Sequence, residues 1–191
     1  SYLLTSSGLN MIPVPTNIGP VYSGTLGYLR GSPNGGRIAA ANYMMPEVNL
    51  FDFDNLNGTL SNGITIPVTN PYGVEFSPDG NLLYVSSSTL GAIYQYNLLA
   101  SNIASSQVLL SSSMLFPGAI QSAPDNKIYF ADVDASYLSV VNNPNTIGLG
   151  CDFIFNGVYL GGQLSQGGLP TFYSSIFNTV AEGCDSVATA I

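Results

Sequence analysis

The stretch YGVEFSPDGNLLYVSSS, residues 72 to 88, contains the pattern from which the fold can be predicted. Apolar and polar residues alternate before Ser77 and again from Leu83 to Ser88, and Ser-Pro-Asp-Gly separates the two runs. Alternation with a period of two predicts β-strands, and Pro-Asp-Gly predicts the tight turn that joins them. In such a turn Pro78 presets φ, Asp79 can bond its own backbone, and Gly80 takes a positive φ. The stretch therefore predicts a β-hairpin, and turn chemistry is sufficient to explain Asp79.

The same layout occurs twice more in the chain, in GYLRGSPNGGRIAAANY (residues 27–43) and GAIQSAPDNKIYFADV (residues 118–133). When the three copies are aligned, Pro33, Pro78 and Pro124 are 45 and 46 residues apart. The first copy has Asn where the second has Asp79, so a charge at this position is optional. Self-similarity at a fixed period of this length indicates a repeat architecture.

Each copy continues with further short runs rich in Val, Ile, Tyr and Phe. A third run follows in all three copies, at residues 48–54, 92–98 and 137–143, and a weaker fourth run follows in two of them, at 64–69 and 106–112. Four antiparallel strands in about 45 residues are typical of one blade of a β-propeller. The alternative is a β-sandwich with coincidental spacing. We predict an all-β chain with the β-propeller fold.

The number of blades does not follow directly from the three full repeats. Repeats start near residues 27, 72 and 118 within a propeller region of residues 1–180, and residues 1–26 resemble the outer part of a preceding blade. The stretch GGLPTFYSSIF is a candidate start of a further repeat, since its Pro170 lies 46 residues after Pro124, although it lacks the Asx-Gly pair. Residues 181–191 would be a linker or the start of a following module. We expect part of a larger propeller; the alternative is a closed four-bladed ring that uses strands from both ends.

The composition excludes several functions. Charged residues make up 7% of the 191 residues, against roughly 25% in an average domain, and the net charge is -8 with three basic residues. A nucleic-acid groove needs clustered Lys and Arg, so we expect no nucleic-acid partner. No apolar run is long enough for a membrane helix, so we expect no membrane insertion. The absence of histidine excludes Ser-His-Asp triads and His-based zinc sites.

Several segments carry a family resemblance. They are GYLRGSPNGGRIAAANY, VNLFDFDN, NPYGVEFSPDGNLLYVSS, IYQYNL, IASS, APDNKIYFAD, YLSVVNNPN, NGVYLGG and SQGGLPTF. Together they resemble the propeller region of secreted surface proteins of Bacteroidota that are exported by the type 9 secretion system. The tail from YLSVVNNPN to SQGGLPTF is the most specific part. The resemblance implies a secreted or cell-surface location, an adhesin-like role and further domains in the same polypeptide, and it implies no catalytic residues.

Three polar residues are candidates for the channel of the propeller. Glu75 is an acid in a predicted first strand, and Arg30 and Gln121 hold the equivalent positions of the neighbouring repeats. First strands line a propeller's channel, so these side chains could bind a polar ligand there. The alternative is a hydrated rim that contains an Arg–Glu pair, and this is the interpretation that we favour.

Two pairs of acids are candidates for calcium. Asp52 and Asp54 alternate in one strand, and Asp132 and Asp134 repeat the arrangement at the end of another. Paired carboxylates on one face could bind calcium if further oxygens lay nearby. Turn and strand-end roles are the simpler explanation, since no DxDxDG spacing is present. We expect no other cofactor.

Covalent modification is a further possibility. Cys151 and Cys184 fit no CxxC pattern, and are either two buried thiols or one disulfide, which would imply an oxidising compartment. The surface, rich in uncharged polar residues, leads us to favour the disulfide. Asn57 begins an Asn-Gly-Thr sequon. Ser186, in Asp-Ser-Val, resembles the short O-glycosylation motif of Bacteroidota.

These observations leave three functions open. The first, which we favour, is a non-enzymatic binding or scaffold module with a protein or glycan partner at the cell surface. The second is a propeller hydrolase of the lactonase type, in which carboxylates and a metal would act without histidine. The third is a structural subunit of a surface filament, with strands exchanged between neighbours.

Overall fold

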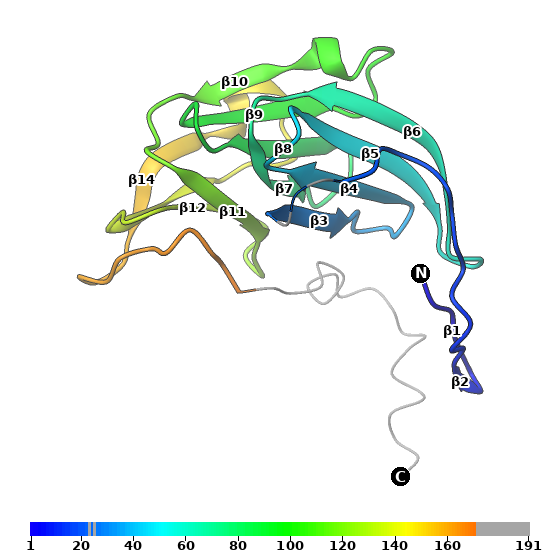
Figure 1. The fold of residues 1–191 in the computed structure, drawn as a ribbon. Coiled ribbons are helices and arrows are strands. Elements are labelled where there is room, and N and C mark those ends of the chain that lie inside the picture. Colours follow the sequence, from blue (N-terminus) through cyan, green and yellow to red (C-terminus); the bar gives the residue numbers. More distant parts are fainter. Residues whose placement is uncertain (23, 25, 171–191) are drawn as a thin grey trace.

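The computed structural model describes residues 1–22, 24 and 26–170 (Figure 1). Within them lie three four-stranded antiparallel sheets, each made of strands consecutive in the chain. The first blade contains β3 (Gly27–Gly31), β4 (Arg37–Asn42), β5 (Glu47–Asp54) and β6 (Thr59–Pro67). The second contains β7 (Pro71–Phe76), β8 (Leu82–Ser87), β9 (Ala92–Asn97) and β10 (Val108–Ser111). The third contains β11 (Pro117–Ser122), β12 (Ile128–Asp132), β13 (Tyr137–Val141) and β14 (Phe153–Tyr159). The predicted blades are confirmed.

The predicted hairpin turn forms as its residues require. Gly80 has φ +74°, and its N–H donates to the carbonyl of Ser77 over 2.8 Å. The Asp79 carboxylate accepts the N–H of Asn81 at 3.1 Å. Hydrogen bonds from Ser77 and Asn81 hold the pKa of Asp79 below its ordinary value, against the effect of its partial burial. Asp79 is therefore a turn residue, as the sequence predicts.

The core lies between the blades. The first and second blades enclose one apolar cluster, which contains Ala39, Ala41, Val48, Leu50, Ile66, Val68, Val74, Phe76, Leu83, Val85, Tyr96, Leu98 and Ile103. The second and third blades enclose another, which contains Leu82, Tyr84, Ile93, Met114, Ile120, Ile128, Phe130, Val141 and Cys151. Neighbouring residues of β8, such as Leu83 and Tyr84, enter different clusters because successive side chains of a strand point to opposite faces. The second blade is consequently apolar on both faces.

The fourth strand of the third blade was missed by the sequence prediction. β14 follows a connection that includes the short 3-10 helix η2 (Gly148–Cys151). Asn156 in its middle has φ +54°, and most of the strand is exposed. These features weaken the alternation of apolar and polar residues on which the prediction depends.

Residues before the first blade form only one small hairpin among the described positions. β1 (Leu4–Thr5) pairs with β2 (Gly8–Leu9), and neither joins a blade. The following segment lies against the first blade, where the Tyr22 hydroxyl donates to Asn49 Oδ1 over 3.0 Å. The other helix is η1 (Ala104–Ser106), and no helix of the described residues is long and apolar enough to cross a membrane.

Residues 165–170 run beside β11. The N–H of Ala119 donates to the carbonyl of Gly167 over 2.8 Å, and a Cβ built on Gly118 would lie 2.2 Å from that same oxygen. A Cβ built on Gly73 would likewise lie 2.4 Å from the carbonyl oxygen of Gly118. The segment is thus placed against β11 much as β11 is placed against β7. The rest of GGLPTFYSSIF lies outside the described residues.

Candidate functional site

The first strands of the three blades bring together Arg30, Glu75 and Gln121. These residues come from β3, β7 and β11 and occupy equivalent positions, 45 and 46 residues apart. The sequence placed them in first strands, and the structure shows that their side chains meet. We refer to them below as the inner-strand cluster.

Arg30 is the centre of the inner-strand cluster. Its Nη2 donates to Gln121 Oε1 over 2.6 Å and to the carbonyl of Ile120 over 3.3 Å, and its Nε lies 3.4 Å from Glu75 Oε2. Its guanidinium carbon lies 5.3 Å from the centre of the Tyr28 ring, within the range of a cation–π interaction. One arginine therefore links all three blades.

Glu75 is the most deeply buried member, at 2% exposure. Its Oε2 accepts the N–H of Ser122 at 3.2 Å, and its Oε1 accepts the N–H of Phe76 at 3.1 Å. Burial raises the pKa of Glu75 to about 7, although the charge of Arg30 and the two backbone donors act in the opposite direction. Desolvation wins here because a carboxylate loses its hydration and regains only part of it from the protein.

The inner-strand cluster satisfies most of its own polar groups. Gln121 donates to the carbonyl of Ser122 over 3.1 Å and is 5% exposed, while Arg30 is 9% exposed. Among the described residues, the Nε of Arg30 is the one buried side-chain polar atom without a hydrogen bond of good geometry. This arrangement favours the Arg–Glu pair over an open ligand site, and binding of a polar ligand by these three residues stays a prediction.

The first pair of calcium candidates is occupied by protein contacts. Asp52 lies 3.6 Å from the Nε of Arg37 and accepts the side-chain amide of Asn62 at 2.8 Å. Asp54 accepts the backbone N–H of Leu56 at 2.9 Å and the side chain of Asn57 at 2.7 Å, and these bonds lower its pKa. Asp54 therefore begins a turn, as the simpler interpretation predicts.

The two acids of the second pair lie in different environments. Asp132 is buried, and its two carboxylate oxygens accept the N–H groups of Leu115 and Phe116 at 2.9 and 2.7 Å. Asp134 is exposed at φ +58°. Within residues 1–22, 24 and 26–170, no three His, Cys, Asp or Glu side chains approach closely enough to hold a metal ion. Calcium also accepts backbone and amide oxygens, so calcium binding by these four acids stays a prediction.

The modification candidates lie partly outside the described residues. Cys151 is buried in the core between the second and third blades, and burial raises the pKa of its thiol. Cys184 and Ser186 are outside the described residues, so the disulfide and the O-glycosylation site stay predictions. Asn57 is exposed in the turn between β5 and β6, a position that an oligosaccharide could reach.

A second set of equivalent polar residues was not recognised in the sequence. Asn42, Ser87 and Asp132 end the second strands of the three blades at intervals of 45 residues, and all are buried. Each hydrogen-bonds a neighbouring loop. Asn42 Oδ1 accepts the N–H of Met44 at 3.0 Å, and the Ser87 hydroxyl donates to the carbonyl of Thr69. The 45-residue interval between these positions could have identified the set. It was not recognised because the three residues are of different types.

No protein-family profile and no curated protein matches this chain. Solved structures do match. A putative 6-phosphogluconolactonase from Bacteroides uniformis superposes with a TM-score of 0.51 and 17% identity, over 75% of this chain and 47% of that one. A second, from Bacteroides fragilis, gives 0.50 and 16% identity, over 73% and 46%. This chain thus spans less than half the length of either structure, and it has the β-propeller fold.

Proposed function

We propose that the chain is a non-enzymatic binding or scaffold module of a secreted or cell-surface protein, with a protein or glycan partner. The observation that carries this proposal is the dispersal of its carboxylates. Asp52 accepts the side-chain amide of Asn62 in β6, and Asp54 and Asp79 accept N–H groups of their own turns. Asp132 holds a loop, and Glu75 pairs with Arg30. Among the described residues, no three His, Cys, Asp or Glu side chains lie close enough together to hold a metal ion.

A lactonase-type hydrolase is the competing proposal. The two similar solved structures are described as putative 6-phosphogluconolactonases, but at 16 and 17% identity the likeness extends to the fold alone. A hydrolase without histidine would need converging carboxylates or a metal. Glu75 is the buried acid in the inner-strand cluster and would be the candidate for a catalytic carboxylate. Its oxygens already contact the Arg30 guanidinium and accept two backbone N–H groups.

The cellular location rests on the sequence resemblance. The segment from YLSVVNNPN to SQGGLPTF resembles surface proteins of Bacteroidota that the type 9 system exports. Uncharged polar residues cover much of the chain in place of Lys and Glu, and such a surface suits contacts with neighbouring surface molecules. We therefore propose export to the cell surface.

One experiment separates the two functions. The purified chain is screened against glycan and surface-protein arrays with and without calcium, and in parallel for hydrolysis of 6-phosphogluconolactone. The proposal expects calcium-independent binding to a defined glycan or protein and hydrolysis no faster than in buffer. Hydrolysis that disappears in the Glu75→Gln variant would establish the enzyme instead. Absence of binding on every array would also count against a binding module.

A further inference from the structure

A cavity of about 290 Å³ lies on the first blade, beside the segment that precedes β3. Its walls come from residues 18–20, from alternate residues of β5 and from residues 63–65 in the middle of β6. Figure 1 shows the preceding segment, in blue, where it runs across this blade. We call this space the β5–β6 cavity.

Two glycines hold the preceding segment and β6 against the ring of Phe51. A Cβ built on Gly19 would lie 2.8 Å from Phe51 Cζ, and a Cβ built on Gly63 would lie 3.2 Å from Phe51 Cε1. Gly19 also has φ +83°, a conformation that glycine adopts without steric cost. The backbone therefore packs directly on the ring, and this close packing gives the β5–β6 cavity a defined shape.

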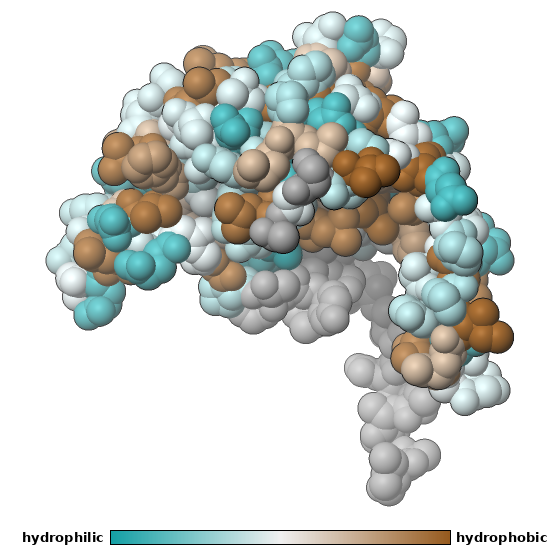
Figure 2. Space-filling view, in the orientation of Figure 1, coloured by the Kyte–Doolittle hydropathy of each residue, from teal (hydrophilic) through white to brown (hydrophobic). Residues whose placement is uncertain are grey.

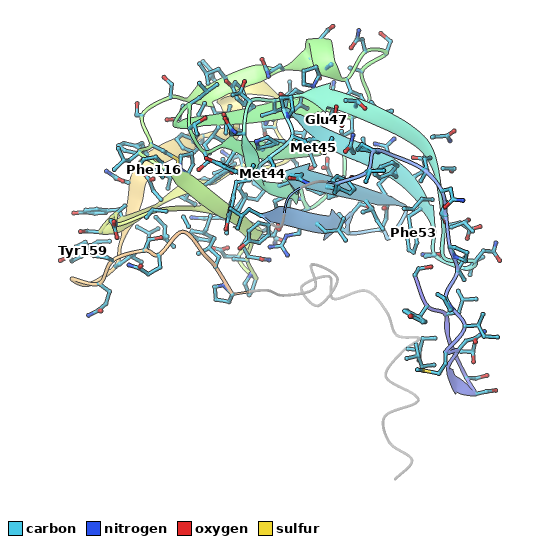
Figure 3. All side chains as sticks on the ribbon, viewed as in Figure 1. Met44, Met45, Glu47, Phe53, Phe116 and Tyr159 are labelled. Carbon is cyan, nitrogen blue, oxygen red and sulfur yellow. The ribbon has the colours of Figure 1, made fainter. Side chains whose placement is uncertain are left out.

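A buried amide organises the polar side of the β5–β6 cavity. Asn49 is 2% exposed, and its Oδ1 accepts the Tyr22 hydroxyl at 3.0 Å. Its Nδ2 lies 3.2 Å from Glu47 Oε1 and 3.4 Å from Thr65 Oγ1. Figure 3 shows Glu47 at the beginning of β5, two positions before Asn49 and thus on the same face of the strand. One carboxylate and one hydroxyl are consequently held on either side of the amide.

The hydrogen-bonding capacity that remains in the β5–β6 cavity selects the chemistry of a ligand. Among the described residues, the Thr65 hydroxyl donates to no protein group, and Glu47 Oε2 accepts from none. A ligand must therefore accept a bond from Thr65 and donate one to Glu47. An ammonium group offers donors alone, and a phosphate or an ionised carboxylate offers acceptors alone, whereas hydroxyl groups do both. Negatively charged ligands are further disfavoured because none of the three basic residues, all of which the structure describes, lines the cavity.

The other walls of the β5–β6 cavity are apolar. They include Ile18, Pro20 and Ile64, of which Ile64 is 41% exposed. Figure 2 shows apolar and polar residues side by side over this part of the first blade. Cavities that bind small molecules measure roughly 300–1,000 Å³ and combine apolar walls with a few polar groups. A volume at the lower end of that range suits one small ring that has apolar C–H faces and hydroxyl groups at its edge.

We propose that the β5–β6 cavity binds one neutral pyranose residue of a glycan. Hydroxyl groups of the sugar bond Glu47 Oε2 and the Thr65 hydroxyl, and its C–H face packs on Pro20 and Ile64. This inference rests on the proposed function and deepens it, because it names the class of glycan and the site that binds it. The β5–β6 cavity shares no residue with the inner-strand cluster.

Saturation-transfer NMR with four methyl pyranosides tests the proposal. The probes are the methyl glycosides of glucose, galactose, mannose and N-acetylglucosamine, and the native chain should bind at least one with a millimolar dissociation constant. Thr65→Val removes the hydroxyl and Glu47→Gln removes the charge, each at nearly constant shape, and each should weaken binding about three- to tenfold. The matched control is Thr59→Val, which removes an exposed hydroxyl of the same strand outside the cavity and should bind like the native chain. Circular dichroism melts establish that the three variants are folded.

Three results would overturn the proposal. The first is the absence of saturation transfer from all four pyranosides. The second is unchanged binding in both Thr65→Val and Glu47→Gln. The third is binding of pentane-1,5-diamine in place of the sugars, lost in Glu47→Gln but kept in Thr65→Val, which would identify an ammonium site. Any of these results, together with a partner found on the glycan and protein arrays, rejects the cavity and leaves the proposed function standing. The proposed function itself fails when the arrays show no partner.

Discussion

The buried carboxyl of Glu75 should make the stability of the fold depend on pH in a defined window. Its pKa is about 7 in the folded chain, against an ordinary value of 4.5. The folded state therefore binds a proton more tightly than the unfolded state, so the free energy of unfolding falls as pH rises from 4.5 to 7. The full difference corresponds to about 3 kcal/mol. Below pH 4.5 this destabilisation is absent, and above pH 7 it is complete and constant.

Glu75→Gln is the informative substitution, because glutamine has nearly the shape of the protonated carboxyl and carries no charge. The variant should match the native chain near pH 4.5 and exceed its stability at pH 8 by up to about 3 kcal/mol. Urea denaturation at pH 4.5, 5.5, 6.5 and 8 measures this, and urea leaves charge interactions unscreened. The chain has no histidine, so few other groups titrate in the window.

Asp134→Asn is the matched control, since it removes one exposed acid at φ +58°, a backbone conformation that asparagine accepts. It should retain the native dependence on pH. The reasoning is refuted if native stability is level or rises between pH 5 and 7, or if Glu75→Gln is the less stable protein at pH 8. Either result would mean that the attraction of Arg30 across 3.4 Å outweighs the burial of the carboxylate.

Three further comparisons test the packing and the turns, each by denaturant unfolding. Gly73→Ala should destabilise the fold by several kcal/mol, because its Cβ would lie 2.4 Å from the carbonyl oxygen of Gly118, whereas Gly168→Ala, with nothing within 4 Å, should be nearly neutral. Gly80→Asn should cost less than about 1 kcal/mol, since the equivalent turn of the third repeat holds an asparagine at φ 60°, while Gly80→Val should cost more. Gln95→Leu should cost about 2–3 kcal/mol, because the buried amide bonds three groups of the second and third blades. Equal stability of Gly73→Ala and Gly168→Ala, of Gly80→Asn and Gly80→Val, or of Gln95→Leu and the native chain would each contradict the corresponding argument.

Most of the strands, their turns and the blade as the repeating unit could be predicted from the sequence. Pro78, Asp79 and Gly80 specify their turn through local torsion angles and local hydrogen bonds, so no distant residue is needed to predict it. The same turn chemistry recurs at Pro33 and Pro124, and the distance in sequence between the prolines gives the length of one blade. β14 was not predicted because apolar and polar residues alternate only weakly along it. Its strand conformation is stabilised by pairing with β13, a contact that its own residues do not reveal.

Which side chains of different blades contact one another could not be predicted from the sequence. The spacing made Arg30, Glu75 and Gln121 equivalent, yet equivalence alone does not say whether the three side chains face an open channel or bond one another. The bond from Arg30 to Gln121 joins residues 91 positions apart and depends on how three sheets pack. Local sequence specifies local hydrogen bonds, whereas the contacts between blades depend on the packing of whole sheets.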